Sequence, residues 1–145
     1  MPLGPSTDTL AALAPAMTAL RLSLHVLAAS VWVGGQITVA GLLGTVRGFG
    51  EGAPRAIART FGRLEWPAFA LLIATGVWNV LATHPSHEST AWKVVLAAKI
   101  AVALAAGLAA WLHQRARSRA GLAAYGAVTA LASLVALVLG VLLAG

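Results

Sequence analysis

The sequence predicts an all-α integral membrane protein, a four-helix bundle with both chain ends outside the cytoplasm. Of its 145 residues, 59% are hydrophobic and 10% are charged, whereas about a quarter of the residues in a soluble domain are charged. Four apolar segments reach the roughly 20 residues that a helix needs to cross the hydrocarbon core. None of them alternates in polarity as a transmembrane strand would, and backbone amides in lipid find partners only within a helix.

The expected spans cover residues 19–46, 64–83, 91–113 and 122–144. Residues 1–16 are rich in proline and glycine, so we expect a flexible N-terminal lead-in, followed by one transmembrane domain over residues 17–145. Glu65, Trp66 and Pro67 are expected to open the second span, since proline is tolerated in the first turn of a helix. Small residues crowd the third and fourth spans, which predicts closely packed helices.

The basic residues predict how the bundle is oriented. Seven arginines lie in the connections between spans one and two and between spans three and four: Arg47, Arg55, Arg59, Arg63, Arg115, Arg117 and Arg119. The positive-inside rule places these connections in the cytoplasm. The net charge of +6 therefore reflects membrane topology, and we expect a lipid bilayer and no nucleic acid as partner. The sequence contains no cysteine, which excludes disulfides, thiolate metal sites and cysteine nucleophiles.

Two ionisable side chains fall inside the expected spans, His25 in the first and Lys99 in the third. Each lies six to eight residues, or roughly 10 Å along the helix, from the outer end of its span. Ionisable groups inside a membrane are costly and usually serve a function. Because the two residues share a depth, we predict that they belong to one site. Imidazole can ligate copper, iron or zinc, whereas an ammonium group attracts an anion.

Each span carries one stripe of polar and small residues, and the stripes are expected to converge. In the first span the stripe contains His25, Trp32 and Gln36, and Lys99 lies on the stripe of the third span. The remaining polar residues are Thr75 and Asn79 in span two and Tyr125, Thr129 and Ser133 in span four. For this second set we expect ordinary hydrogen bonds between helices.

The outer connection contains a second candidate for metal binding. His84 and His87 lie three residues apart in "THPSHEST", beside Glu88. Two imidazoles and a carboxylate can bind Cu(II) or Zn(II). The alternative is that these exposed histidines are simply solvated. The predicted metal ligands are therefore His25, His84 and His87.

The motif "LHVLAASVWVGG" at residues 24–35 resembles the first helix of the copper-resistance protein D (CopD) family. Residues 61–81 and 92–115, with Thr75–Gly76 and the mid-helix Lys99, resemble its next two segments. This resemblance implies a protein of the bacterial cytoplasmic membrane that handles or transports copper. It also implies an extracytoplasmic copper-binding protein as a partner.

The length, layout, His25 and Lys99 are also similar to those of the haem-binding bacterial protoporphyrinogen oxidase (HemJ) family. That resemblance implies a haem-dependent membrane oxidoreductase in which His25 is an axial ligand of haem b and Lys99 is its neighbour in the site. We accordingly expect His25, Lys99 and Trp32 to bind a cofactor, either copper or haem b. His84, His87 or a neighbouring subunit would supply a second ligand.

Enzymatic activity is left open by the residues themselves. No acid–base pair, nucleophile or phosphate-binding loop is recognisable, so no catalytic residue is predicted. A third interpretation is a structural subunit of a membrane complex, in which the polar stripes only join helices. A homo-oligomer or a membrane partner subunit is compatible with each interpretation.

Overall fold

The computed structural model describes residues 7–144, with side chains from Pro15 onward. These residues form an all-α bundle, which confirms the predicted fold class. Its elements are α1 (Thr7–Ala29), η1 (Ser30–Gly34), α2 (Gly35–Arg47), α3 (Ala53–Thr83), η2 (Pro85–His87), α4 (Thr90–Arg115) and α5 (Arg119–Ala144). Within this part of the chain, four segments are long and apolar enough to cross a membrane: Pro15–Arg47, Ala53–Thr83, Thr90–Arg115 and Arg119–Ala144.

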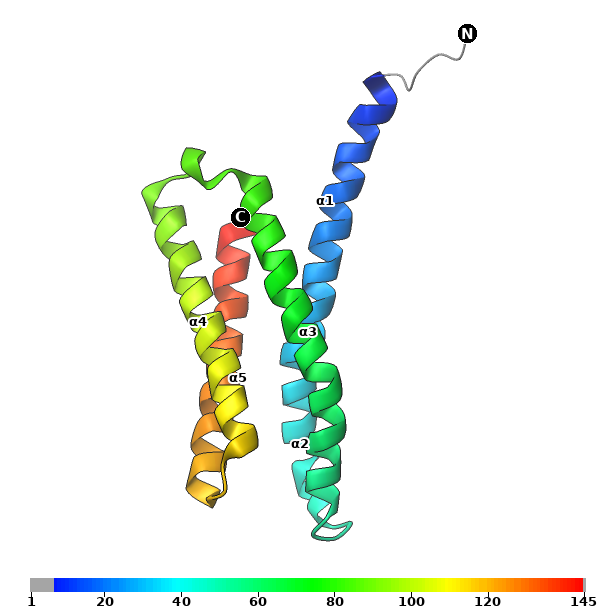
Figure 1. Cartoon of the computed structure of the whole chain (residues 1–145), viewed down its shortest axis with the longest axis vertical. Helices are drawn as coiled ribbons and strands as arrows, with labels where there is room; N and C mark the ends of the chain where they lie inside the picture. The colour runs from blue at the N-terminus through cyan, green and yellow to red at the C-terminus, as the bar shows by residue number, and fades with distance from the viewer. Residues whose placement is uncertain (1–6, 145) are drawn as a thin grey trace.

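The helices form two antiparallel hairpins. One consists of α1, η1 and α2 packed against α3, and the other of α4 packed against α5 (Figure 1). The start of α1 and the end of α5 lie at the same end of the bundle as the α3–α4 connection. We call this the histidine end, after His84 and His87 in that connection. The opposite end, where α2 and α4 finish and α3 and α5 begin, is called the arginine end after Arg47 and Arg115.

Large apolar side chains cover the outside of the bundle. Leu81, Val141 and Val26 are between 62% and 69% exposed, as expected of groups that contact lipid. The interior of α4 is built from small residues, and Ala106, Gly107, Ala109 and Ala110 are all buried. The predicted role of small residues in close helix packing is therefore confirmed for α4.

Gly107 shows why a small residue is required at the contact between the hairpins. A Cβ atom added to Gly107 would lie 2.5 Å from Cζ of Phe69. The α3 ring thus packs directly on the α4 backbone, a position that no side chain at residue 107 could share.

The first span is not one regular α-helix, because η1 is a π-helical segment in its centre. Such single-turn π segments are rare and often occur at functional sites. Trp32 lies within η1 and is 3% exposed. Directly after it, Gly35 packs against the ring of Phe61, and an added Cβ would overlap the ring atoms, whereas the space around Gly34 is open. Packing against Phe61 therefore requires a glycine at residue 35, and it does not require one at residue 34.

Two expected helix boundaries differ from the structure. Helix α3 begins at Ala53, with proline in its first turn, and Pro67 lies inside it. The prediction that Glu65, Trp66 and Pro67 open this span is therefore wrong. The proline in the first turn of α3, where proline is favoured, is Pro54. Helix α1 begins at Thr7 and contains Pro15, so the expected lead-in is helical from Thr7 onward. Its residues 1–6 lie outside the described part of the chain.

The ends of α3 and α4 at the histidine end follow ordinary capping chemistry. Ser89 caps α4 by accepting a hydrogen bond of 3.1 Å from the backbone amide of Trp92. His84 ends α3 in the left-handed conformation, with a φ of 49°, which is common immediately after a helix.

Candidate functional site

His25 is tied to α3 by one hydrogen bond within the first hairpin. Its Nδ1 atom lies 2.8 Å from Oγ1 of Thr75, and both groups are shielded within the bundle. Thr75 is 3% exposed. The imidazole ring lies over Gly76, where an added Cβ would be 3.6 Å from Cε1 of His25. The Thr75–Gly76 pair therefore provides a hydroxyl for one ring nitrogen and space for the edge of the ring.

The Thr75 hydroxyl determines which ring nitrogen carries the proton. Its Oγ1 atom lies 2.7 Å from the carbonyl oxygen of Leu71 and 3.2 Å from that of Leu72. A carbonyl oxygen only accepts, so the single hydroxyl proton is donated to the α3 backbone. Thr75 then accepts a hydrogen bond from His25, which places the imidazole proton on Nδ1. In the neutral ring Nε2 consequently carries a free lone pair, the state needed for metal ligation.

Lys99 enters the interior from α4 and lies against α5. An added Cβ on Gly140 would be 2.8 Å from Nζ of Lys99 and 3.4 Å from its Cε. Trp92 marks the relative level of the two helices, because its indole lies 3.4 Å from the carbonyl oxygen of Leu143. From this register, the Cα of Lys99 lies about 6 Å deeper than that of Gly140. The side chain therefore rises toward the histidine end, as a snorkelling lysine does.

His25 and Lys99 belong to different hairpins and contact different helices. His25 packs on α3 and Lys99 packs on α5. The hydrogen bond between Trp32 and Ser133 joins the two hairpins, and His25 and Gly140 each lie seven residues from that bond toward the histidine end. His25 and the Gly140 position that Lys99 contacts therefore lie at a similar level of the bundle, and no hydrogen bond joins His25 to Lys99 among the described residues.

An aromatic cluster closes the interior on the arginine side of His25. The indole nitrogen of Trp32 donates a 2.8 Å hydrogen bond to Ser133, which is buried in α5. The Trp32 ring lies 4.4 Å from that of Phe69 and 6.2 Å from that of Trp66, measured between centroids. This cluster joins the two hairpins, and Trp32 lies about 10 Å from His25 along the first span, toward the arginine end.

The polar residues expected only to join helices behave in different ways. Thr75 and Ser133 bond across helices to His25 and Trp32. Thr129 bonds back to its own helix at Tyr125. Tyr125 itself is 37% exposed and lies one turn from the buried Thr129 on the same stripe of α5.

Arg21 and Asn79 also belong to this region, and sequence reasoning missed Arg21. Both carry a buried polar atom without a hydrogen-bond partner, Nε in Arg21 and Oδ1 in Asn79. Arg21 precedes His25 by one helical turn and Asn79 follows Thr75 by one turn. Because α1 and α3 are antiparallel, both lie about 6 Å from the His25–Thr75 pair toward the histidine end. The spacing of four residues from His25 was the signal that could have identified Arg21.

A second polar group, Glu65, is buried nearer the arginine end. It is 7% exposed on α3. Gln36, on α2, has a buried Nε2 atom without a partner. A carboxyl beside tryptophan and proline is typical of a helix start, but Glu65 lies twelve residues after the start of α3.

The exposed histidines do not reach His25. His84 precedes η2 and His87 is its last residue, and Thr75, the partner of His25, lies about 14 Å from His84 along α3. Within the described residues, no group of three or more His, Asp or Glu side chains is arranged to hold a metal ion. The structure therefore does not bring together the three predicted metal ligands.

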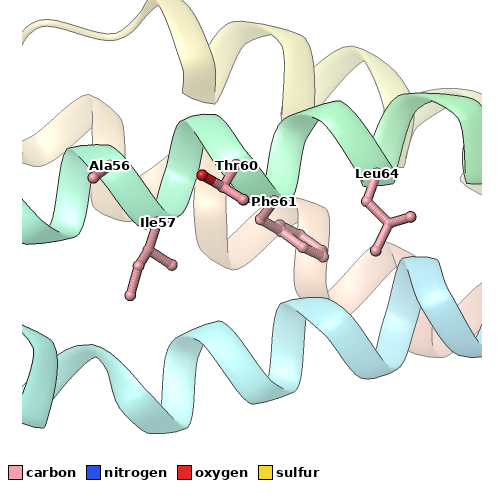
Figure 2. A pocket seen from close by; sticks show the side chains of 5 residues that line it. All are labelled: Ala56, Ile57, Thr60, Phe61 and Leu64. Carbon is pink, nitrogen blue, oxygen red and sulfur yellow. The ribbon is translucent and has the colours of Figure 1, made fainter.

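A surface groove at the arginine end is separate from this region. It has a volume of about 410 Å³ and lies at the arginine end, between α3 and α2. Figure 2 shows its lining, which consists of Ala56, Ile57, Thr60, Phe61 and Leu64. Without a titratable or metal-ligating side chain in that lining, the groove is no candidate for the cofactor site.

Comparison of the chain with protein-family models, with curated proteins and with solved structures gave no match. The resemblances to the copper-resistance protein D and haem-binding protoporphyrinogen oxidase families therefore stay predictions from the residues. What the structure itself defines is a multi-pass helical membrane protein with a half-buried imidazole in its interior.

Proposed function

We propose that this protein binds haem b in the half of the bundle nearest the histidine end, and that Nε2 of His25 is the nitrogen that would hold the iron. The observation that carries this proposal is the chain of hydrogen bonds from His25 through Thr75 to the Leu71 carbonyl. A hydrogen bond from Nδ1–H to a neighbouring acceptor is the usual companion of a ligating histidine, because it fixes the tautomer and the ring orientation.

Haem fits these residues better than a bare copper ion. A single imidazole is available, and the described residues offer no set of three ligands around it. Haem would need only one or two ligands from the protein. Copper(I) would require soft ligands, but the sequence has no cysteine and only two methionines. The nearby Lys99 ammonium would also repel a bare cation, whereas it attracts the carboxylates of haem.

When bound, haem would supply one-electron redox chemistry. The contributions of the chain are ligation and positioning. His25 would provide the lone pair, Thr75 would orient the imidazole ring, and Trp32 and Phe69 would supply apolar surface on the arginine side of the site. Since the residues contain no recognisable acid–base pair, we favour electron transfer or an oxidoreductase that relies on the cofactor. This agrees with the resemblance to the haem-binding protoporphyrinogen oxidase family.

The proposed cellular setting follows from the distribution of basic residues. Arg47 ends α2, Arg115 ends α4 and Arg119 begins α5, all at the arginine end. By the positive-inside rule this end faces the cytoplasm. The His25 site would then lie in the outer half of a bacterial cytoplasmic membrane.

The test is the visible spectrum of the protein purified from membranes in the presence of haem. We expect a Soret band in the wild type, loss of that band in His25→Ala, and retention in His84→Ala and His87→Ala. These two loop variants are matched controls, because they remove an imidazole without touching the interior. A His25→Ala variant that is correctly inserted and keeps full haem occupancy would contradict the proposal. Copper in the wild type without haem, lost on substituting His84 or His87, would instead favour the copper-handling interpretation.

A further inference from the structure

Two surface grooves follow one another along α3, where this helix meets the first span. The first is the groove of about 410 Å³ at the arginine end, lined from Ala56 to Leu64. The second has a volume of about 220 Å³ and is lined by Leu27 and Val31 of the first span and by α3 as far as Leu71. Both linings contain Leu64. The two grooves, together called the α3 groove, therefore extend about 22 Å along the helix.

The α3 groove has the lining and the length that a lipid acyl chain requires. Leu64, where its two parts adjoin, is 58% exposed. Figure 2 shows the side chains of Ile57, Phe61 and Leu64 projecting from α3 toward the neighbouring α2 helix. One acyl chain covers one leaflet, or about half of the roughly 30 Å hydrocarbon core. A whole chain therefore fits along the groove.

A row of basic side chains accompanies the α3 groove at the arginine end. This arginine stripe consists of Arg55, Arg59 and Arg63, which are four residues apart and all exposed. Residues four apart lie on one face of a helix. Each arginine is followed directly by a residue that lines the groove. The arginine stripe and the groove therefore occupy neighbouring faces of α3.

The sequence of α3 does not balance the charge of the arginine stripe. From Ala53 to Leu64 it contains three arginines and no acidic residue. Like charges one turn apart repel each other, and Arg55 also lies in the first turn, where the helix dipole favours an anion. The positive-inside rule explains basic residues in this part of the chain, but it does not require them to share one face beside a groove. A bound phosphate would offset the repulsion.

We infer that the arginine stripe and the α3 groove form a binding site for one anionic phospholipid of the leaflet at the arginine end. The phosphate lies on the stripe, because guanidinium groups match phosphate geometry. One acyl chain follows the groove toward Leu71. Basic pockets between helices on the cytoplasmic side are typical sites for anionic headgroups. The inference is independent of the haem proposal, since it uses none of the residues around His25.

The experiment is a lipid titration of the purified, delipidated full chain in a neutral detergent, measured by native mass spectrometry. The probes are phosphatidylglycerol and phosphatidylcholine with identical acyl chains, which differ in the net charge of the headgroup. Wild type should bind phosphatidylglycerol about 10- to 100-fold more tightly, as expected for two or three arginines near an anionic headgroup.

Two triple variants with the same loss of charge locate the headgroup. The first replaces the arginine stripe: Arg55→Gln, Arg59→Gln and Arg63→Gln. It should lose most of the preference for phosphatidylglycerol. The matched control replaces three arginines of the other hairpin, at the same end of the bundle: Arg115→Gln, Arg117→Gln and Arg119→Gln. It should keep the preference.

A second pair of variants tests the position of the acyl chain, and it does not depend on the arginine variants being stable. Leu64→Gln should weaken the binding of both lipids about ten-fold, because it removes the apolar contact that the two parts of the groove share. Leu122→Gln is the control and should bind both lipids as wild type does. Leu122 is 40% exposed and lies near the start of α5, outside the groove.

Four results would overturn the inference. The first is equal affinity of wild type for the two lipids, and the second is an equal loss of preference in both triple variants, which would follow the total charge instead of the site. The third is unchanged lipid binding in Leu64→Gln. The fourth is a dimer in the mass spectrum that Leu64→Gln abolishes, because it would assign the groove to a second copy of the chain.

Discussion

Replacing Thr75 by valine tests how the protein prepares His25. Valine has the shape of threonine but lacks the hydroxyl, so the variant keeps the packing at a residue that is 3% exposed. It removes the acceptor that lies 2.8 Å from Nδ1 of His25. The imidazole then loses the group that fixes its tautomer, and its Nδ1–H bond is left without this partner.

The expected magnitude follows from the geometry of the His25–Thr75 pair. Loss of a hydrogen-bond partner behind a metal ligand typically reduces affinity about 10- to 100-fold, which corresponds to about 1.4–2.8 kcal/mol at 25 °C. The Thr75→Ser variant keeps the hydroxyl and should retain most of the affinity. Thr129→Val is the matched control, because Thr129 is a buried threonine whose hydroxyl bonds only to the Tyr125 carbonyl of its own helix.

Haem titration of the purified apoprotein, followed at the Soret band, measures this effect. We expect weaker binding in Thr75→Val, and affinities near wild type in Thr75→Ser and Thr129→Val. Unchanged affinity in Thr75→Val, with the band still lost in His25→Ala, would show that Thr75 does not prepare the ligand. An equal loss of affinity in Thr129→Val would show that the effect comes from general destabilisation of the bundle.

Three further predictions concern the packing that holds the site. Gly35→Ala should lower the thermal unfolding midpoint in detergent, because the added methyl group overlaps the Phe61 ring. Gly34→Ala is the control and should leave the midpoint nearly unchanged, because its methyl group enters open space. Equal midpoints for the two variants would contradict the contact between Gly35 and Phe61. Ser133→Ala should reduce the free energy of unfolding by about 1–3 kcal/mol, since it leaves the buried Trp32 indole donor unpaired. An unchanged free energy of unfolding in a denaturant titration would exclude a net contribution of this hydrogen bond. Gly107→Ala should separate the hairpins at Phe69 and destabilise the protein more than Gly44→Ala, a position with open space; the reverse order in the same titration would contradict the packing.

The sequence was sufficient to predict the helical class and the approximate extent of three spans. Hydropathy and length determine these features directly, because the bilayer imposes a single length scale. The start of α3 at Ala53 was not predictable from hydropathy, since the helix continues beyond its apolar part. Arg55, Arg59 and Arg63 lie on this extension, although their charges suggested a connection.

The candidate site was predictable in part. An imidazole and an amine inside apolar segments identify His25 and Lys99 from the sequence alone. The direction of each side chain depends on which helices are neighbours, and that follows from the three-dimensional packing of the hairpins. The same is true of η1, because no simple sequence pattern predicts that Ser30–Gly34 adopts a π-helix. Arg21 was overlooked because one arginine near the end of a span resembles an interfacial anchor.

The central claim is that His25 presents a free Nε2 lone pair inside the bundle because its Nδ1–H group donates a hydrogen bond to Oγ1 of Thr75. Nitrogen NMR of the apoprotein, labelled with ¹⁵N-histidine and assigned with His25→Gln, measures this directly. The account predicts a protonated, pyrrole-type Nδ1 and an unprotonated, pyridine-type Nε2 for His25. The opposite assignment, with the proton on Nε2, would contradict it, because the nitrogen proposed to bind iron would then have no lone pair to offer.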